Sequence, residues 1–180
     1  DLAGYDAVIC ATGSRPILPG VPGIDKPGVM DALEVLNGAR KPEGRIAVIG
    51  GGLVGTETAL HLAEQGMHTT LVEMLPKIMN GVAATDQLAY SERIAKADME
   101  VCTGTRLVSI GDGEITVSDH TGTHTIPADS VIIAIGLKAQ DSLYGELWAQ
   151  GKEAYLVGDA VHPGKSFDAF HTAYRVAWKI

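Results

Sequence analysis

Apolar residues along this chain fall into short runs that are separated by turns rich in glycine and proline. The runs at residues 5–11, 45–49, 69–73, 130–135 and 154–157 contain many β-branched residues. Short continuous apolar runs are typical of parallel strands that are buried on both faces. The pattern therefore predicts an α/β fold built around a parallel sheet.

Other parts of the chain have apolar residues at the spacing of an α-helix. Asp31 and Glu34 have the spacing of a capping box, which predicts a short helix from there to about Leu36. Longer helices are expected at residues 84–99, 140–150 and 168–180. In the last of these, the residues expected to face inward are Ala169, Phe170, Ala173, Val176 and Ala177.

The segment between the second and third apolar runs carries the strongest signal for a binding site. Gly50, Gly52 and Gly55 form a G-x-G-x-x-G loop that follows a predicted strand and opens an amphipathic helix. The first glycine permits a tight turn, the second lets the backbone approach a pyrophosphate, and the third lets the helix pack against the sheet. The free N–H groups of a helix N-terminus suit a phosphate anion. This order of elements predicts a dinucleotide site, although glycines that serve packing alone are the alternative.

Glu73 ends the strand that follows this helix, where an acidic residue accepts hydrogen bonds from the adenosine ribose hydroxyls. A carboxylate at this position repels a 2′-phosphate, so we expect NADH to bind in preference to NADPH. Lys77 lies close behind and weakens that expectation.

Strands at both ends of the chain flank a nucleotide-binding segment that is complete in the middle. We therefore predict that residues 41–136 form an NAD(P)H-binding domain inserted into another domain. Residues 1–40 supply one part of that second domain together with a Pro- and Gly-rich linker, and residues 137–180 supply the rest.

Composition excludes several classes of function. The chain has 180 residues, 46% of them hydrophobic, and a net charge of −8, which argues against a nucleic-acid partner. No apolar run reaches the roughly 18 residues of a membrane span. The acidic start is unlike a signal peptide, and two isolated cysteines indicate a reducing compartment, so we expect a cytoplasmic location.

Three motifs together resemble those of the flavoproteins with two dinucleotide-binding domains, the pyridine nucleotide–disulfide reductase-like superfamily. Ala11-Thr12-Gly13 resembles the turn after an FAD-domain strand, and Gly158-Asp159 resembles the motif whose aspartate binds the FAD ribityl chain. The loop from Gly50 to Glu57 resembles the superfamily's NAD(P)H loop. The resemblance implies a Rossmann-like NAD(P)H-binding domain inserted into the remaining part of an FAD-binding domain. It also implies that Glu57 lies near the nicotinamide, whereas the residues alone also allow a first-turn acid favoured by the helix dipole.

Within that superfamily the chain is most similar to the C-terminal region of enoate reductase, 2,4-dienoyl-CoA reductase and trimethylamine dehydrogenase. Residues 28–36, 71–76 and 158–163 carry this likeness. It implies a longer flavoenzyme that passes a hydride from NADH to FAD, with an iron–sulfur cluster and FMN in an upstream region. The superfamily's first FAD loop is absent from this sequence, and Gly136-Leu-Lys-Ala-Gln140 replaces the usual G-x-x-P-N. We therefore expect a C-terminal piece whose partner is the missing N-terminal part of the same flavoprotein.

These inferences assign cofactor-binding residues and no catalytic or metal-ligating side chain. The residues expected to bind NADH are Gly50, Gly51, Gly52, Leu53, Val54, Gly55, Glu57, Glu73, Met74 and Gly136. The residues expected to contact FAD in the longer enzyme are Ala11, Thr12, Gly13, Gly158 and Asp159. An alternative function is a non-catalytic module that binds an ADP-like nucleotide in a structural or regulatory role.

Overall fold

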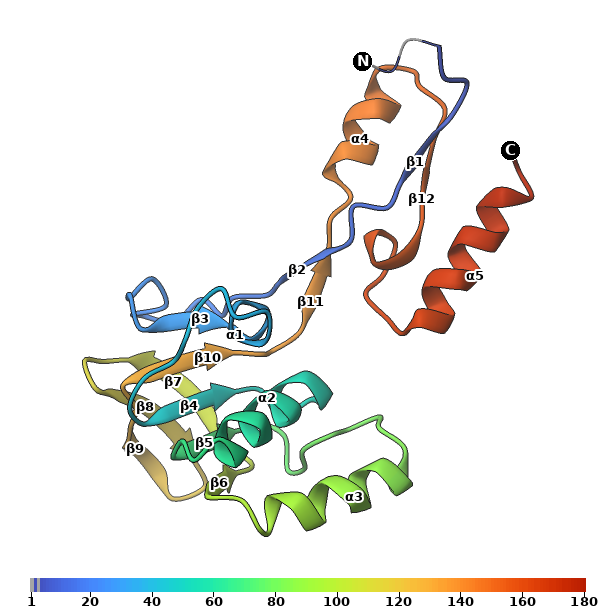
Figure 1. The fold of residues 1–180 in the computed structure, drawn as a ribbon. Helices are drawn as coiled ribbons and strands as arrows, with labels where there is room; N and C mark the ends of the chain where they lie inside the picture. The colour runs from blue at the N-terminus through green and yellow to red at the C-terminus, as the bar shows by residue number, and fades with distance from the viewer. Residues whose placement is uncertain (1, 3) are drawn as a thin grey trace. The chain divides into compact units, whose positions relative to one another are not determined.

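The computed structural model describes residue 2 and residues 4–180, and the chain divides into two compact units. The central unit runs from Ile17 to Gly136, and the end unit combines Asp1–Pro16 with Leu137–Ile180. Figure 1 shows the elements of both. In the described part of the chain, none of the helices is long and apolar enough to cross a bilayer.

The central unit is built on a five-stranded parallel sheet in the order β3-β10-β4-β5-β6, as the apolar runs predicted. These strands are Val29–Asp31, Ser130–Ile133, Ile46–Ile49, Thr69–Val72 and Met99–Cys102. All four residues of β4, β5 and β10 are buried. Such complete burial explains why these strands do not alternate between apolar and charged residues, although Thr69, Thr70 and Ser130 are buried polar residues within them.

Each face of this sheet has its own core, because successive side chains of a strand point to opposite sides. Ile46 and Val48 pack with Ala59 and Leu62 of α2 (Leu53–Glu64). Ala47 and Ile49 face the other way, toward a three-stranded antiparallel sheet (Figure 1). Its strands are β7 (Arg106–Ile110), β8 (Glu114–Asp119) and β9 (Gly122–Pro127). The nucleotide motif thus lies on a sheet that is covered on both sides.

The central unit begins at Ile17, well before residue 41, where the sequence placed its start. Residues 29–31 form β3, which pairs with β10, and Ile110 donates a backbone hydrogen bond to Pro22 at 2.9 Å. A Cβ on Gly23 would lie 2.1 Å from the carbonyl oxygen of Ile110, so the predicted linker packs closely on this unit.

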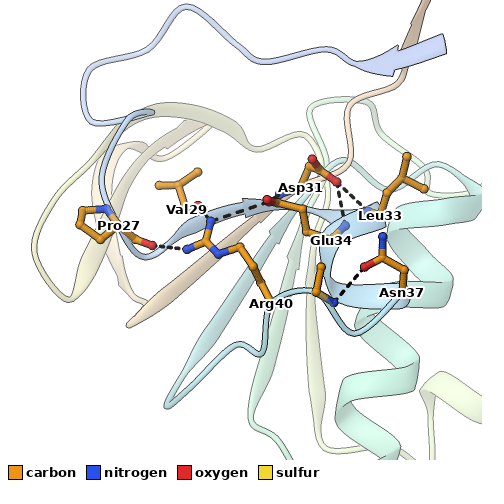
Figure 2. Close-up of polar contacts among 8 residues, drawn as sticks. Pro27, Val29, Asp31, Leu33, Glu34, Asn37 and Arg40 are labelled. Carbon is orange, nitrogen blue, oxygen red and sulfur yellow. Dashed lines mark hydrogen bonds and ion pairs between the residues drawn. The ribbon is translucent and has the colours of Figure 1, made fainter.

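Polar contacts around Arg40 attach the segment after the linker to the sheet (Figure 2). Asp31 caps α1 (Ala32–Leu36), and Glu34 accepts a hydrogen bond from the Asp31 backbone at 3.0 Å, which confirms the predicted capping box. Arg40 donates to the Val29 carbonyl at 2.6 Å and to the Pro27 carbonyl, and its guanidinium lies 3.7 Å from Glu34. The helix α1 and the β3 strand are therefore fixed as one piece.

The end unit holds two short strand pairs and two α-helices (Figure 1). β1 (Val8–Cys10) runs parallel to β12 (Ala154–Leu156), and β2 (Ser14–Pro16) runs antiparallel to β11 (Leu137–Ala139). The helices are α4 (Ser142–Ala149) and α5 (Ser166–Ala177), and a 3₁₀ turn, η1, spans Gly158–Ala160. Its core cluster of buried residues is Cys10, Leu147 and Ala154.

The prediction for the inward face of α5 was largely wrong. Val176 is buried and Ala169 is half-buried, but Phe170, Ala173 and Ala177 are exposed. Helical periodicity identified an apolar stripe correctly, yet the end unit offers little surface for that stripe to cover.

Candidate functional site

Three parallel strands of the central unit end at one edge of the sheet, and the predicted nucleotide residues follow them. Gly50 follows β4, Glu73 follows β5, and Ala134 follows β10. The Gly50 N–H donates to Val72 and the Ala134 N–H donates to Ile49, each at 2.8 Å. In open α/β sheets, ligands bind outside the carboxyl ends of strands at such an edge.

The three loop glycines meet different surroundings. Gly50 has a φ of +108°, and a Cβ there would lie 2.5 Å from the carbonyl oxygen of Ala134. A Cβ on Gly55 would lie 1.8 Å from the carbonyl oxygen of Gly50, so only glycine lets α2 approach its own loop this closely. A Cβ on Gly52 would meet no atom within 4 Å. The space beside Gly52 is therefore the place where a ligand can touch the backbone.

Both backbone polar groups of Gly51, the N–H and the carbonyl, form hydrogen bonds. Glu73 Oε2 accepts a hydrogen bond from the Gly51 N–H at 2.6 Å, and the Met79 N–H donates to the Gly51 carbonyl at 2.6 Å. Glu73 is 8% exposed, and its Oε1 accepts from the Leu75 N–H at 2.7 Å. The carboxylate thus ties the glycine loop to the turn that follows β5.

Gly52 is the N-cap residue of α2, and no side chain caps this helix. The first N–H groups of an α-helix have no partner within the helix. Leu53 and Val54 are 37% and 41% exposed, so the first turn of α2 lies at the surface. Together with the partial positive charge of the helix N-terminus, this geometry suits a phosphate group.

Glu57 lies one turn further along α2 and is half-buried. Its carboxylate accepts a hydrogen bond from the Tyr90 hydroxyl on α3 (Ala84–Ile94). This hydrogen bond, aided by partial burial and by the charge of Glu57, raises the pKa of the Tyr90 phenol above its ordinary value. A cavity of about 330 Å³ adjoins the pair and is lined by Leu53, Glu57, Asp86, Ala89, Tyr90 and Arg93.

The other two residues predicted to bind NADH lie on exposed turns of the central unit. Gly136 has a φ of +125°, and its carbonyl accepts from the Ile17 N–H at 3.0 Å. Met74 follows Glu73 directly and is 66% exposed. Gly136 and Met74 follow β10 and β5 respectively, so both belong to loops at the same sheet edge.

The end unit brings the two predicted FAD motifs together at the carboxyl ends of β1 and β12. Ser14, next to Gly13, donates a hydrogen bond to Asp159 at 3.2 Å. Asp159 also accepts from the Gly164 N–H, and the Gly158 N–H donates to Thr172 of α5 at 2.8 Å. Ala11 and Thr12 are exposed, and the Thr12 hydroxyl donates to the carbonyl of Gln140.

Sequence reasoning missed two residues that shape the site. Met79 has a φ of +56° and is 2% exposed, although a buried methionine in the left-handed region has no signature in a sequence. Only the neighbouring Asn80-Gly81 marks a turn there. Tyr90 contacts Glu57 from 33 residues away, which no local pattern reveals.

Comparison with known proteins identifies the family. The model for "Pyridine nucleotide-disulphide oxidoreductase" matches residues 2–160. The chain belongs to this family. The structural and sequence matches therefore confirm the resemblance and the Rossmann-like fold that the motifs predicted.

Relatives of known activity are oxidoreductases. Bilirubin reductase of Mediterraneibacter gnavus is 35% identical over 86% of this chain and 24% of its own length. NADH oxidase of Thermoanaerobacter brockii is 35% identical over 97% of this chain and 28% of its own length. The structure of a 2-naphthoyl-CoA reductase in complex with 2-naphthoyl-CoA superposes with a TM-score of 0.89, at 31% identity over 97% of this chain and 27% of that one.

The chain thus spans about a quarter of the length of these relatives. It is a pyridine nucleotide- and FAD-binding module of the kind found in flavin oxidoreductases.

Proposed function

We propose that this chain is the NADH-binding part of a flavin-dependent oxidoreductase, which passes a hydride from NADH to FAD. The observation that carries the proposal is the open helix N-terminus at Gly52, set beside the buried carboxylate of Glu73 at the same sheet edge. A phosphate-binding loop and a ribose-binding acid are the two parts that a dinucleotide site requires.

In this proposal the pyrophosphate of NADH lies against the backbone at Gly52, Leu53 and Val54, where the N–H groups donate to it. The adenosine ribose lies at Glu73. A carboxylate has about four lone-pair sites, and the Gly51 and Leu75 N–H groups occupy two of them. The remaining sites suit the two ribose hydroxyls, whereas the negative charge disfavours the 2′-phosphate of NADPH.

The nicotinamide end then extends along α2 toward Glu57, one turn beyond the pyrophosphate. NADH supplies the hydride in this chemistry, and the protein positions and tunes the cofactors. No side chain of this chain needs to act as an acid or base, so we assign none as catalytic. Gly136 supplies a further backbone contact from the neighbouring loop.

The residues of the end unit fit one end of an FAD site. Asp159 has lone pairs left after it accepts from Ser14 and Gly164, and Ala11, Thr12 and Gly13 follow β1, which pairs with β12. The described residues of the end unit contain no counterpart of the pyrophosphate-binding glycine loop of FAD, and in the proposed enzyme the N-terminal part of the flavoprotein supplies it. FMN and an iron–sulfur cluster belong to a region upstream of this chain in the proposed longer enzyme, which acts in the cytoplasm.

Calorimetric titration of the chain with NADH and with ADP tests the proposal. ADP shares the adenosine and pyrophosphate contacts but lacks the nicotinamide end. We expect NADH to bind in the micromolar range and clearly more tightly than ADP. Equal affinities would favour the alternative of a structural module that binds an ADP-like nucleotide, and no binding of either would reject both.

A further inference from the structure

Two polar links join α3 to α2, although α3 has no buried residue among its described positions. Near the start of α2, Tyr90 donates its hydroxyl proton to Glu57. Near the end of α2, Arg93 forms two hydrogen bonds to the carboxylate of Glu64, at 3.0 and 2.8 Å. The guanidinium of Arg93 also lies 5.6 Å from the centre of the Tyr90 ring, which is a cation–π distance.

These links differ in where they lie relative to the proposed cofactor. The Glu64 carboxylate lies at the far end of α2, two turns away from Glu57. Within the described residues, its hydrogen-bond partner is Arg93 alone. Glu57 lines the cavity that begins at Leu53, next to the open helix N-terminus. Tyr90 therefore contacts the one α2 acid that can reach a ligand from the loop.

A free glutamate side chain loses considerable rotamer freedom when it grips a ligand. The hydrogen bond from Tyr90 removes this cost in advance, because one carboxylate oxygen is fixed and the other stays available. Tyrosine suits this task, since its ring is rigid and Arg93 holds the ring from one face. The raised pKa of Tyr90 keeps the phenol protonated, and hence a donor, throughout the neutral range.

We propose that Tyr90 is a positioning residue that orients the Glu57 carboxylate to accept a hydrogen bond from the carboxamide N–H of NADH. This inference rests on the proposed dinucleotide site and extends it to α3, which no motif of the sequence connects to the cofactor. The carboxamide is a planar amide with two donors, and a fixed carboxylate oxygen is a suitable acceptor for it.

The test compares NADH and ADP affinities for the wild-type chain and for Tyr90→Phe. Loss of the orienting hydrogen bond should weaken NADH binding by about three- to tenfold. ADP binding should stay unchanged, because ADP has no carboxamide. If Tyr90 acts through Glu57, then Tyr90→Phe should have no further effect in a Glu57→Ala background.

Two control variants separate orientation from simple attachment of α3. Glu64→Gln weakens the other link between the helices and should leave the NADH affinity unchanged. Tyr155→Phe removes a comparable hydroxyl, which donates to Glu153 at 2.6 Å in the end unit, and should also have no effect. Alkaline titration of tyrosinate absorbance gives an independent reading, since Glu57→Ala should lower the pKa of Tyr90.

The outcomes distinguish this inference from the proposed function. If wild-type chain prefers NADH over ADP but Tyr90→Phe binds both like wild type, the role of Tyr90 is rejected and the site stands. Equal weakening of NADH and ADP, or the same loss in Glu64→Gln, would show that Tyr90 only attaches α3. A wild-type chain that binds NADH no better than ADP would overturn the proposed function and this inference with it.

Discussion

At the scale of single residues, a substitution at Gly52 allows its effect on nucleotide binding to be measured apart from its effect on stability. A Cβ at this position would meet no atom within 4 Å, yet a side chain there would enter the space proposed for the pyrophosphate. Gly52→Asp therefore tests the site directly. Aspartate is a favourable N-cap residue, so the free energy of unfolding should stay equal or rise by a few tenths of a kcal/mol. NADH affinity should fall about a hundredfold or more, because the added carboxylate repels the phosphates.

Titration calorimetry and urea denaturation of the same preparation measure both effects. Gly55→Ala is the matched control, since its Cβ would lie 1.8 Å from the Gly50 carbonyl oxygen. That variant should lose about 1–3 kcal/mol of stability through overpacking. Unchanged NADH binding in Gly52→Asp would place the nucleotide elsewhere.

In the proposed site, Glu73 holds the glycine loop and also selects NADH over NADPH. Glu73→Gln keeps the shape of the side chain but places an amide NH₂ where Gly51 or Leu75 now donates. One buried N–H then loses its acceptor, so stability should fall by about 1–3 kcal/mol. The preference for NADH over NADPH should drop about tenfold, because the negative charge is removed. Parallel titrations with the two nucleotides check this.

Glu100→Gln is the control for a general loss of charge, since Glu100 is exposed on the neighbouring strand β6. It should alter neither stability nor selectivity. A Glu73→Gln chain with wild-type selectivity would mean that Glu73 only holds the loop.

At the scale of elements, an ion pair joins the starts of β4 and β10, at the edge opposite the site. Asp129 accepts two hydrogen bonds from the Arg45 side chain and one from its backbone, all at 2.9 Å. These bonds lower the pKa of Asp129 well below its ordinary value. A carboxylate whose pKa is lowered on folding stabilises the folded state at pH values above its unfolded-state pKa of about 4. This contribution is lost as the pH falls below that value.

Asp129→Asn should therefore be less stable than wild type at neutral pH, and the difference should shrink below about pH 4. Urea midpoints measured across that range test the prediction. Asp112→Asn is a useful comparison, because Asp112 pairs with Lys26 and is almost fully exposed. A deficit in Asp129→Asn that did not vary with pH would assign the effect to packing.

The central strands of the sheet were predicted from short runs of apolar and β-branched residues, and the helices from apolar spacing or a capping box. Strands β4, β5 and β10 are buried on both faces, and their residues are apolar or β-branched apart from Ser130. Strand β9 escaped prediction because most of its residues, Gly122–Pro127, are exposed and polar. Strand β3 has only three residues and follows a segment of glycines and prolines, so no period could develop.

At the scale of the whole molecule, the end unit contains much less core than the central unit. Its parallel sheet has two strands, and isolated two-stranded sheets are marginally stable. Large apolar side chains remain uncovered on α4, on α5 and directly after α5, namely Trp148, Phe167, Phe170, Tyr174 and Trp178. This exposure supports the proposal that a further part of the flavoprotein completes this unit.

If a further part of the flavoprotein completes this unit, the isolated chain should purify without colour. In the proposed FAD site, Ala11–Gly13 and Gly158–Asp159 are the contacts expected among the described residues of the end unit, and the FAD pyrophosphate is bound by a loop outside them. An absorbance spectrum of the purified chain measures bound flavin. Flavin absorbance at a stoichiometric level would contradict the prediction.

The candidate site was predictable from the sequence where its parts are local in the chain. The glycine loop and Glu73 are separated by one strand, one helix and fixed spacing, so a motif describes them. The Met79 N–H donates to Gly51, and the Tyr90 hydroxyl donates to Glu57. Both contacts form because the chain folds back onto the glycine loop, and no sequence spacing specifies that path. The start of the central unit at Ile17 depends in the same way on a contact between distant parts of the chain, namely the pairing of β3 with β10.

Mapping NADH onto the backbone amides of an isotope-labelled chain by NMR tests the central claim most directly. If NADH binds at the glycine loop, the largest shifts should fall on the amides of Gly51–Val54 and of Glu73–Leu75, with smaller changes at Gly136. Amides of the end unit should stay unchanged. Shifts confined to the end unit, or no shifts at saturating NADH, would contradict a dinucleotide site at this sheet edge.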